Sequence, residues 1–211
     1  MKILIIGASG RLGRCLVDQA LAANFAVTAL VRSPTSLQMA HERLAVVRGD
    51  LLEAASLESI IPGHDAILVC VAPKVKFRLE SDLLSKGALN LCHAMSKVKQ
   101  ARLLWVTSAG VDPQYVKGKN FLYKRIIKPF FLANVYADFK LSEEILERSS
   151  LTWSVVRPSR LTDGPLTKTY RVQANGIPEN ANEISRADVA HFMLEEIVDP
   201  RHNFKKALIA Y

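Results

Sequence analysis

The chain has 211 residues, 49% of which are hydrophobic, and a formal net charge of +8. This length suits one packed α/β domain and is short for two, and the apolar fraction argues against an intrinsically disordered chain. No apolar run approaches the roughly 20 residues that cross a bilayer. The apolar start at residues 2–6 ends at Gly7, too early for a secretory signal, so we expect a cytoplasmic protein.

Apolar, β-branched runs alternate with segments of helical periodicity along the chain. The runs that predict strands are residues 2–6, 26–31, 44–48, 65–71, 102–107 and 152–156, with a last strand at about 206–210. Such alternation is typical of a parallel sheet with helices on both faces. We therefore predict one Rossmann-type, doubly wound α/β domain over residues 1–211, with the topological switch between the first and fourth strands.

The segments between these strands carry apolar residues at three- to four-residue spacing, as amphipathic helices do. The first helix has the stripe Leu12, Leu16, Ala20 and Ala23, and further helices are expected over residues 53–61, 78–97, 136–149 and 186–198. Ser185 and Asp188 form a variant of the capping box that opens the last helix. Residues 157–211 are expected to form a small C-terminal extension on the substrate side.

Residues 111–135 interrupt the alternation with a basic, amphipathic insertion. Its cations include Lys117, Lys124, Arg125 and Lys128, and Phe121 lies among them. Such a stretch can contact a membrane surface through residues 117–128, and the alternatives are a solvated face or a lid over the substrate. No nucleic-acid partner is expected.

A glycine-rich loop follows the first predicted strand and opens the first predicted helix. Gly7 permits a tight turn, Gly10 lets the backbone approach a pyrophosphate, and Gly13 lets the helix pack on the sheet. The free N–H groups of a helix N-terminus favour a phosphate there. The loop predicts a dinucleotide site made by Gly7, Ser9, Gly10, Arg11, Leu12 and Gly13.

The residue after the second strand indicates which dinucleotide binds. A chain that prefers NAD places an acid there for the ribose hydroxyls, whereas this chain has Arg32. An arginine can hold a 2′-phosphate through a charge-assisted contact. The expected cofactor is therefore NADP, with NAD and a merely solvent-exposed Arg32 as the alternatives.

Other strand ends should meet the same cofactor, because ligands of open α/β sheets bind outside the carboxyl ends of the strands. Asp50 is also a candidate cap of helix 53–61, and Ser108 a candidate cap of the turn that follows it. The residues expected at this edge are Asp50, Leu51, Val71, Ala72, Pro73, Thr107 and Ser108.

Tyr136 and Lys140 are spaced so that they share one face of a helix. A lysine charge beside a tyrosine lowers the tyrosine pKa and allows acid–base catalysis. With Ser108, the pair would form the Ser-Tyr-Lys catalytic set of an epimerase or dehydratase. The alternative is a packed Tyr136 and an exposed Lys140 paired with Glu144. The three cysteines and five histidines show no ligand spacing, so no metal site is predicted.

Several segments together resemble the atypical short-chain dehydrogenases, and most of all the flavin reductase and biliverdin-IXβ reductase group with its NmrA-like relatives. The similarity covers nearly the whole chain. It rests on residues 7–13, 31–32, 49–50, 106–110, 143–151, 156–158, 163–170 and 184–193.

This resemblance implies an NADPH-dependent reductase that passes hydride to a flavin or a planar tetrapyrrole. It implies that Ser108 lies beside the nicotinamide and that a loop with Pro158, Ser159 and Arg160 covers it. The chain has Arg160 where the reductases have a histidine, and Ser36 where they have a second arginine for the 2′-phosphate. A further reading from the NmrA-like relatives is a redox sensor that binds the dinucleotide without catalysis.

Overall fold

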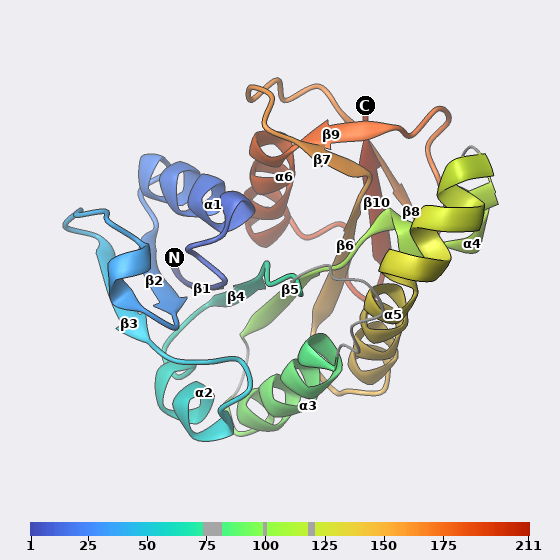
Figure 1. The fold of residues 1–211 in the computed structure, drawn as a ribbon. Coiled ribbons are helices and arrows are strands. Elements are labelled where there is room, and N and C mark those ends of the chain that lie inside the picture. The colour runs from blue at the N-terminus through green and yellow to red at the C-terminus, as the bar shows by residue number, and fades with distance from the viewer. Residues whose placement is uncertain (74–81, 99–100, 118–120) are drawn as a thin grey trace.

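The computed structural model describes residues 1–73, 82–98, 101–117 and 121–211. Its centre is one twisted sheet, largely parallel, with helices on both faces (Figure 1). The strands are β1 (Lys2–Ile6), β2 (Ala26–Val31), β3 (Leu44–Arg48), β4 (Ala66–Val69), β5 (Arg102–Val106), β6 (Trp153–Pro158), β8 (Arg171–Ala174) and β10 (Lys206–Ala210). Their order is β3-β2-β1-β4-β5-β6-β10-β8. The predicted doubly wound Rossmann fold, with its switch between the first and fourth strands, is confirmed.

Strand β1 shows why the sheet lies in the middle. Ile3 and Ile5 pack into one hydrophobic cluster, while Leu4 and Ile6 pack into the cluster on the opposite face. Successive side chains of a strand point to opposite faces, so a strand covered on both sides needs a continuous apolar run. The strand pairs in parallel with β2 on one side and with β4 on the other.

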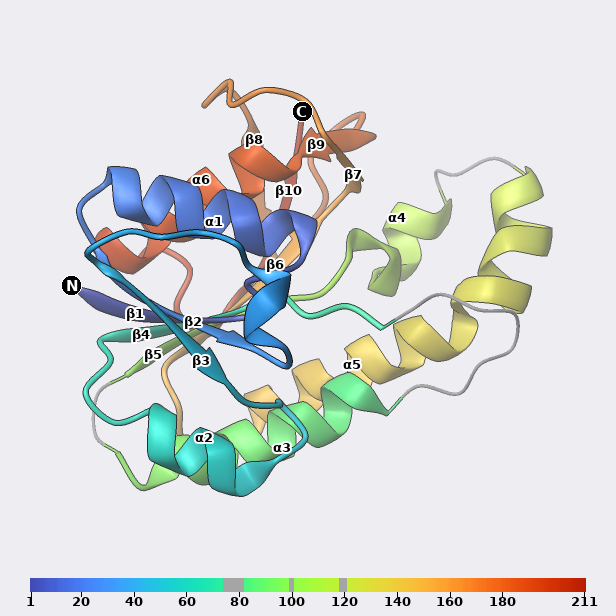
Figure 2. The same cartoon turned by 60° about the vertical axis from the view of Figure 1, so that its left-hand side comes forward.

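Two layers of helices cover the sheet. Helices α1 (Arg11–Ala22) and α6 (Arg186–Val198) lie side by side on one face. Helices α2 (Ala54–Ile60), α3 (Leu83–Ser96) and α5 (Ala133–Glu147) cover the other (Figures 1 and 2). All five predicted helices are present, with ends that differ by a few residues. The expected start of the helix 78–97 falls partly outside the described residues, and α3 begins at Leu83 after its N-cap Asp82.

The last helix begins as its capping sequence predicts. Ser185 is the N-cap of α6, and its Oγ accepts a hydrogen bond of 3.0 Å from the backbone N–H of Asp188. The Asp188 carboxylate is fully buried and accepts hydrogen bonds from the Tyr211 hydroxyl at 2.6 Å and from Thr167 Oγ1 at 2.8 Å. These contacts connect α6 to the loop before β8 and to the C-terminal residue.

Three short strands of the C-terminal extension were not predicted. Strand β8 pairs antiparallel with β10, while β7 (Arg160–Thr162) and β9 (Glu183–Ser185) form a separate two-stranded parallel sheet. Each has only three or four residues, which is too short for an alternating pattern to stand out from the background.

The described parts of the basic insertion are largely helical. It contains η2 (Ala109–Val111), α4 (Pro113–Lys117) and the π-helix η3 (Tyr123–Leu132), which continues directly into α5. Pro129 lies inside η3 and lacks the N–H that a regular α-helix would use, a recognised cause of irregular helix geometry. Figure 2 shows this helix standing away from the body of the molecule, at the opposite end of the sheet from the N-terminus.

A buried ion pair joins the sheet to helix α6. Glu196 is 2% exposed, and its carboxylate accepts hydrogen bonds from Arg102 Nη2 at 2.6 Å and from His202 Nδ1 at 2.7 Å. Burial opposes the ionised form of Glu196, but the hydrogen bonds from His202 and Arg102 outweigh it and lower the pKa of this carboxyl.

Within the described ranges, no helix combines the length and apolar character needed to cross a bilayer.

Candidate functional site

The glycine-rich loop adopts a conformation that an anion can approach. Gly7 has φ of 90°, in the region that favours glycine, and its carbonyl accepts a hydrogen bond of 3.0 Å from the N–H of Gly10. Gly10 is the N-cap of α1, no side chain caps this helix, and its first turn contains no acidic residue. The first N–H groups of α1 are therefore available for a phosphate, together with the positive end of the helix dipole.

Gly13 fixes how closely the helix approaches the loop. A Cβ placed on Gly13 would lie 2.2 Å from the carbonyl oxygen of Gly7 and 2.7 Å from Cα of Ala8. Both neighbours are backbone atoms, which cannot rotate away as a flexible side chain can. The role predicted for Gly13, close packing of the helix against the strand, fits this geometry.

A cavity of about 190 Å³ extends from the loop along the carboxyl ends of β1, β2 and β4. Most of the residues expected to bind the cofactor's adenosine and phosphates line it. Those residues are Gly7, Ser9, Gly10, Arg32, Asp50, Leu51, Val71 and Ala72. The other lining residues, most of which are apolar, were not predicted to bind the cofactor: Ile6, Leu30, Val31, Gly49, Cys70 and Leu83.

Two arginines, Arg32 directly after β2 and Arg14 on α1, adjoin the loop that follows β2. Arg32 is exposed and lines the cavity. Arg14, which sequence reasoning missed, donates from Nε to the carbonyl of Ser9 at 3.1 Å and from Nη2 to the carbonyl of Ser36 at 2.6 Å. It therefore ties the phosphate loop to the loop after β2. The only sequence signal was a cation in the first turn of the helix that follows the glycines.

Asp50 does not cap helix α2, so that alternative is wrong. The N-cap is Glu53. The Asp50 Oδ1 instead accepts a hydrogen bond of 3.0 Å from the N–H of Leu52, and its backbone carbonyl accepts one from the N–H of Glu53. Asp50 thereby shapes the turn at the cavity wall.

A second, larger cavity of about 620 Å³ lies beside the first. Its wall is mostly apolar, and Ala72 belongs to the walls of both cavities. The loop that the resemblance placed over the nicotinamide, with Pro158, Ser159 and Arg160, lines this cavity. The other lining residues are Thr107, Ser108, Tyr115, Leu132, Tyr136, Phe139, Leu161 and Asn182. The second cavity thus lies between the carboxyl end of the sheet, the end of the basic insertion that leads into α5, and β7.

The structure brings Ser108 and Tyr136 to this cavity but not Lys140. Ser108 caps the turn after β5, since its Oγ accepts a hydrogen bond of 3.2 Å from the N–H of Gly110. The Lys140 side chain is 68% exposed, and its Nζ lies 3.8 Å from Glu144 Oε1. The alternative arrangement considered for this pair, an exposed lysine beside Glu144, is the one present.

A buried ion pair supports the wall of the second cavity. Thr107 Oγ1 donates a hydrogen bond of 2.7 Å to Oε1 of Glu143, which is 1% exposed. Arg157 on β6 donates to both carboxylate oxygens of Glu143, at 3.0 and 2.5 Å. Arg157 also pairs with Asp112 at 3.3 Å. These contacts hold the ends of β5 and β6 against α5 and thereby fix the positions of Thr107 and Pro158 in the cavity wall.

Four of the residues expected to contact the cofactor line neither cavity. Arg11 pairs with Asp163 at 2.8 Å. Leu12 is buried in the hydrophobic cluster beneath α1, Gly13 lies under the loop, and Pro73 follows the end of β4. In the part of the chain that the structure describes, no three His, Cys, Asp or Glu side chains gather as metal ligands do.

The comparison with known protein families shows the family of the chain. Residues 7–200 match the family described as NAD(P)H-binding. The chain belongs to this family. The match covers the loop, both cavities and most of the C-terminal extension, and the resemblance to atypical short-chain dehydrogenases and NmrA-like proteins is confirmed.

Individual relatives of this NAD(P)H-binding protein include both reductase-like and epimerase-like chains. YhfK of Bacillus subtilis, described as an uncharacterized sugar epimerase, is 28% identical over 205 residues, which cover 93% of this chain and 88% of that one. ChuY of Escherichia coli O157:H7, an anaerobillin reductase, is 20% identical with a TM-score of 0.80 over 100% of this chain and 97% of that one. A short-chain dehydrogenase/reductase from Veillonella parvula in complex with NADP is 16% identical with a TM-score of 0.79, over 100% and 94% of the two chains.

The chain thus has the NAD(P)H-binding fold of oxidoreductases and epimerase-like proteins. The loop geometry fits a dinucleotide on its own terms, because glycines stand where a Cβ would collide with backbone and the N-terminus of α1 carries no competing cap. The backbone N–H groups after Gly10 would hold the pyrophosphate, and the second cavity would receive the nicotinamide end.

Proposed function

We propose that the protein is an NADPH-dependent reductase that passes hydride to a flavin or a similar planar acceptor. The observation that carries the proposal is the pair of adjoining cavities that share Ala72. The first is the smaller, and its wall includes Gly7, Gly10 and Arg32, which suit phosphates. The second is wide and mostly apolar, as a planar ring system requires.

The proposal for NADPH over NADH rests on Arg32 and Arg14. Arg32 lines the first cavity at the position where an NAD-binding chain carries an acid. Arg14 braces the loop that follows, and the hydroxyls of Ser33 and Thr35 lie 2.9 Å apart in that loop. A 2′-phosphate beside Arg32 would gain a charge-assisted contact that NADH cannot make.

The protein's own contribution to the chemistry is orientation and shielding. When bound, NADPH supplies the hydride. Ser108 and Thr107 would orient the nicotinamide amide. Leu132 and Phe139 would exclude water and pack against the acceptor. Arg160 would cover the side of the second cavity that faces solvent. A flavin takes up the accompanying proton from solvent, so this reaction needs no dedicated acid. ChuY, an anaerobillin reductase, has the same fold, which supports a reductase.

The direct test measures binding first and turnover second. NADPH and NADH are titrated by nucleotide fluorescence, and FMN is then added while nicotinamide absorbance is followed. Tighter binding of NADPH with FMN-dependent oxidation is the expected result. Binding without turnover across flavins and quinones would overturn the reductase proposal and favour a sensor, and failure to bind either nucleotide would overturn the assignment of both cavities.

Acid–base chemistry at Tyr136, as in an epimerase or dehydratase, is the second candidate. Tyr136 lines the same cavity as Ser108, and the relative YhfK is described as a sugar epimerase. Tyr136→Phe separates the two candidates, because hydride transfer to FMN should survive the loss of a hydroxyl that epimerase chemistry requires. Tyr115→Phe is the matched control, since it removes another tyrosine hydroxyl from the same cavity.

A further inference from the structure

The segment that stands away from the molecule exposes large apolar side chains. Phe121 is 72% exposed and Leu122 is 54% exposed. The other large apolar residues exposed in this segment are Ile126, Phe130 and Phe131. Ile126 lies four or five residues from the pair Phe121 and Leu122 and from the pair Phe130 and Phe131, about one turn of a helix with i→i+5 hydrogen bonds, so these side chains recur along one side of it. We call these five residues the apolar ridge.

The segment around the apolar ridge is strongly basic. Residues 113–137 contain five cations and no aspartate or glutamate. Arg125 and Lys117 are exposed, and the Arg125 guanidinium lies 6.0 Å from the centre of the Phe121 ring. The remaining cations of this stretch are Lys119, Lys124 and Lys128. An apolar side flanked by cations is the composition of helices that lie in the interface of a bilayer.

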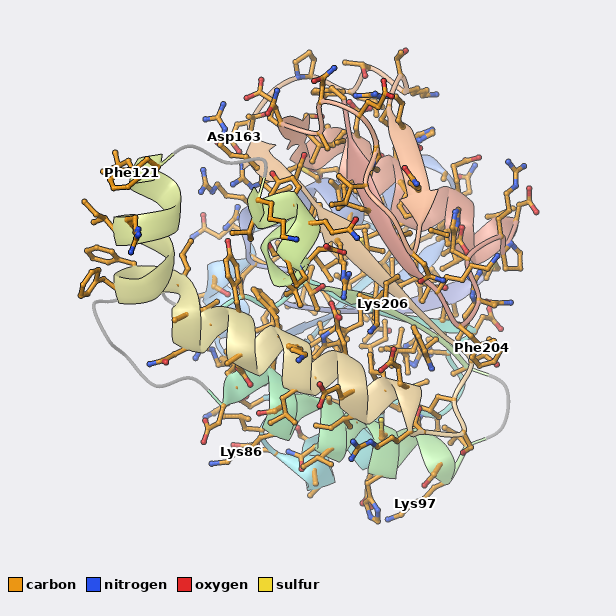
Figure 3. The ribbon with its side chains drawn as sticks, turned by 90° about the vertical axis from the view of Figure 1, so that its right-hand side faces the viewer. Lys86, Lys97, Phe121, Asp163, Phe204 and Lys206 are labelled. Carbon is orange, nitrogen blue, oxygen red and sulfur yellow. The ribbon has the colours of Figure 1, made fainter. Side chains whose placement is uncertain are left out.

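The position of the segment leaves the apolar ridge accessible. Figure 2 shows η3 beyond the end of α5, and Figure 3 shows Phe121 at the outer end of this projection, directed away from the body. A solitary exposed Leu or Phe is common on protein surfaces, but a contiguous group on a projecting element is typical of an interaction site.

We propose that residues 121–132 dock the protein on an anionic lipid surface. The apolar ridge would enter the boundary between headgroups and acyl chains, and the flanking cations would contact anionic headgroups. Charge complementarity favours lipid phosphates as the partner. The aliphatic members Leu122 and Ile126 argue against a nucleic acid, since single-stranded binders use aromatic rings on which bases stack.

Docking would also place the second cavity near the bilayer. Leu132 is the last residue of η3 and Tyr136 belongs to the first turn of α5, and both line this cavity. The cavity therefore begins where the docking helix ends. This proposal does not depend on the reductase assignment, because lipid binding requires neither a dinucleotide nor an acceptor.

Vesicle co-sedimentation of the full-length protein tests the proposal. The probes are vesicles of phosphatidylcholine alone and of phosphatidylcholine mixed with phosphatidylglycerol. We expect binding to the mixed vesicles that weakens as salt is raised, because the charge contribution is screened. Equal absence of binding to both kinds of vesicle, or binding to single-stranded DNA or RNA in place of the mixed vesicles, would overturn the proposal.

Variants locate the contact. Phe121→Ser/Ile126→Ser removes two members of the apolar ridge and should weaken partition onto mixed vesicles at least tenfold. The matched control, Leu89→Ser/Val198→Ser, removes two equally exposed apolar side chains from α3 and α6 and should leave partition unchanged. Loss of binding in the control as well, or its retention in the first variant, would contradict the proposal.

A charge reversal tests whether the cations of this segment contribute to lipid binding. One basic residue near an anionic surface contributes about fivefold to partition, so Arg125→Glu should weaken binding by roughly an order of magnitude. Arg148→Glu reverses an exposed charge at the far end of α5 and is the control. NADPH titration of all four variants should match the wild type, which separates failure of docking from failure of the dinucleotide site.

Discussion

Gly110 and the ring of Tyr136 are in direct contact at the wall of the larger cavity. A Cβ placed on Gly110 would lie 2.2 Å from Cζ of Tyr136 and 2.3 Å from its hydroxyl oxygen. Only glycine at position 110 therefore lets the Tyr136 ring on α5 pack against the turn after β5. This contact joins the turn capped by Ser108 to the helix that carries the candidate acid–base residue.

Gly110→Ala should displace the Tyr136 ring and change the cavity. Overpacking of this kind costs about 1–3 kcal/mol of the free energy of unfolding. Under the proposed function, the KM for the acceptor rises while the Kd for NADPH stays within about twofold, because the smaller cavity does not include either residue. Steady-state kinetics and nucleotide titration check both expectations.

Two further variants test whether the effect of Gly110→Ala comes from its contact with Tyr136. Gly164→Ala is the control, since its Cβ would meet no atom closer than 3.5 Å. Gly110→Ala combined with Tyr136→Leu should recover part of the lost stability, because the ring that meets the new Cβ is gone. An unchanged acceptor KM in Gly110→Ala would mean that the acceptor does not bind beside Tyr136.

Arg32 should decide the preference between the two nucleotides. Hydrogen bonds to charged groups contribute about 1.5–3 kcal/mol, so Arg32→Gln should raise the Kd for NADPH roughly tenfold to a hundredfold. The Kd for NADH should change little, because NADH has no 2′-phosphate. Arg48→Gln removes an exposed arginine at the end of the neighbouring strand β3 and is the control. Equal weakening of both nucleotides by Arg32→Gln would remove the basis for choosing NADP.

The sequence predicts those parts of the site that backbone geometry determines. The spacing of Gly7, Gly10 and Gly13 has a steric cause that any sheet of this type shares, so the loop and the first cavity follow from it. Arg14 and the buried Glu143–Arg157 pair were missed as parts of the site because their partners are distant in sequence. Arg157 lies on β6, whereas its partner Asp112 lies between η2 and α4, and no local pattern shows that the two meet.

Lys140 shows the limit of a short spacing pattern. Tyr136 and Lys140 do belong to one helix, but α5 packs so that Tyr136 meets Gly110 while Lys140 remains at the surface beside Glu144. The rotation of a helix about its axis depends on which residues pack beneath it, and a two-residue pattern does not contain that information. The short strands β7 and β9 escaped prediction because tertiary pairing, and not an alternating sequence, stabilises them.

The Glu196 cluster should contribute strongly to stability. Glu196→Gln leaves the Arg102 guanidinium buried without its counter-charge, and breaking one side of a buried pair costs roughly 3–5 kcal/mol. The adjacent Glu195→Gln is the matched control, since Glu195 is exposed on the same helix. Urea unfolding measures both. Similar, small losses in the two variants would show that the buried pair contributes no more than a surface charge.

His64 should make stability depend on pH in the weakly acidic range. Its ring is buried, with Nε2 2.7 Å from Thr28 Oγ1 and Nδ1 3.1 Å from the carbonyl oxygen of Ile61. Burial is the largest effect on this group and lowers the pKa of His64 below its ordinary value of 6.5. Below that pH the unfolded chain takes up a proton at His64 while the folded chain does not, so protonation favours unfolding.

The stabilisation by neutral His64 is therefore complete above pH 6.5 and declines as the pH falls below that value. His64→Gln keeps a side chain that can hydrogen-bond but does not titrate. The variant should be less stable than the wild type at neutral pH, with a flatter loss of stability on acidification, measured by urea unfolding at a series of pH values. His41→Gln, at an exposed histidine, should reproduce the wild-type profile. If His64→Gln and wild type lose stability in parallel between neutral and weakly acidic pH, another group is responsible for the acid sensitivity.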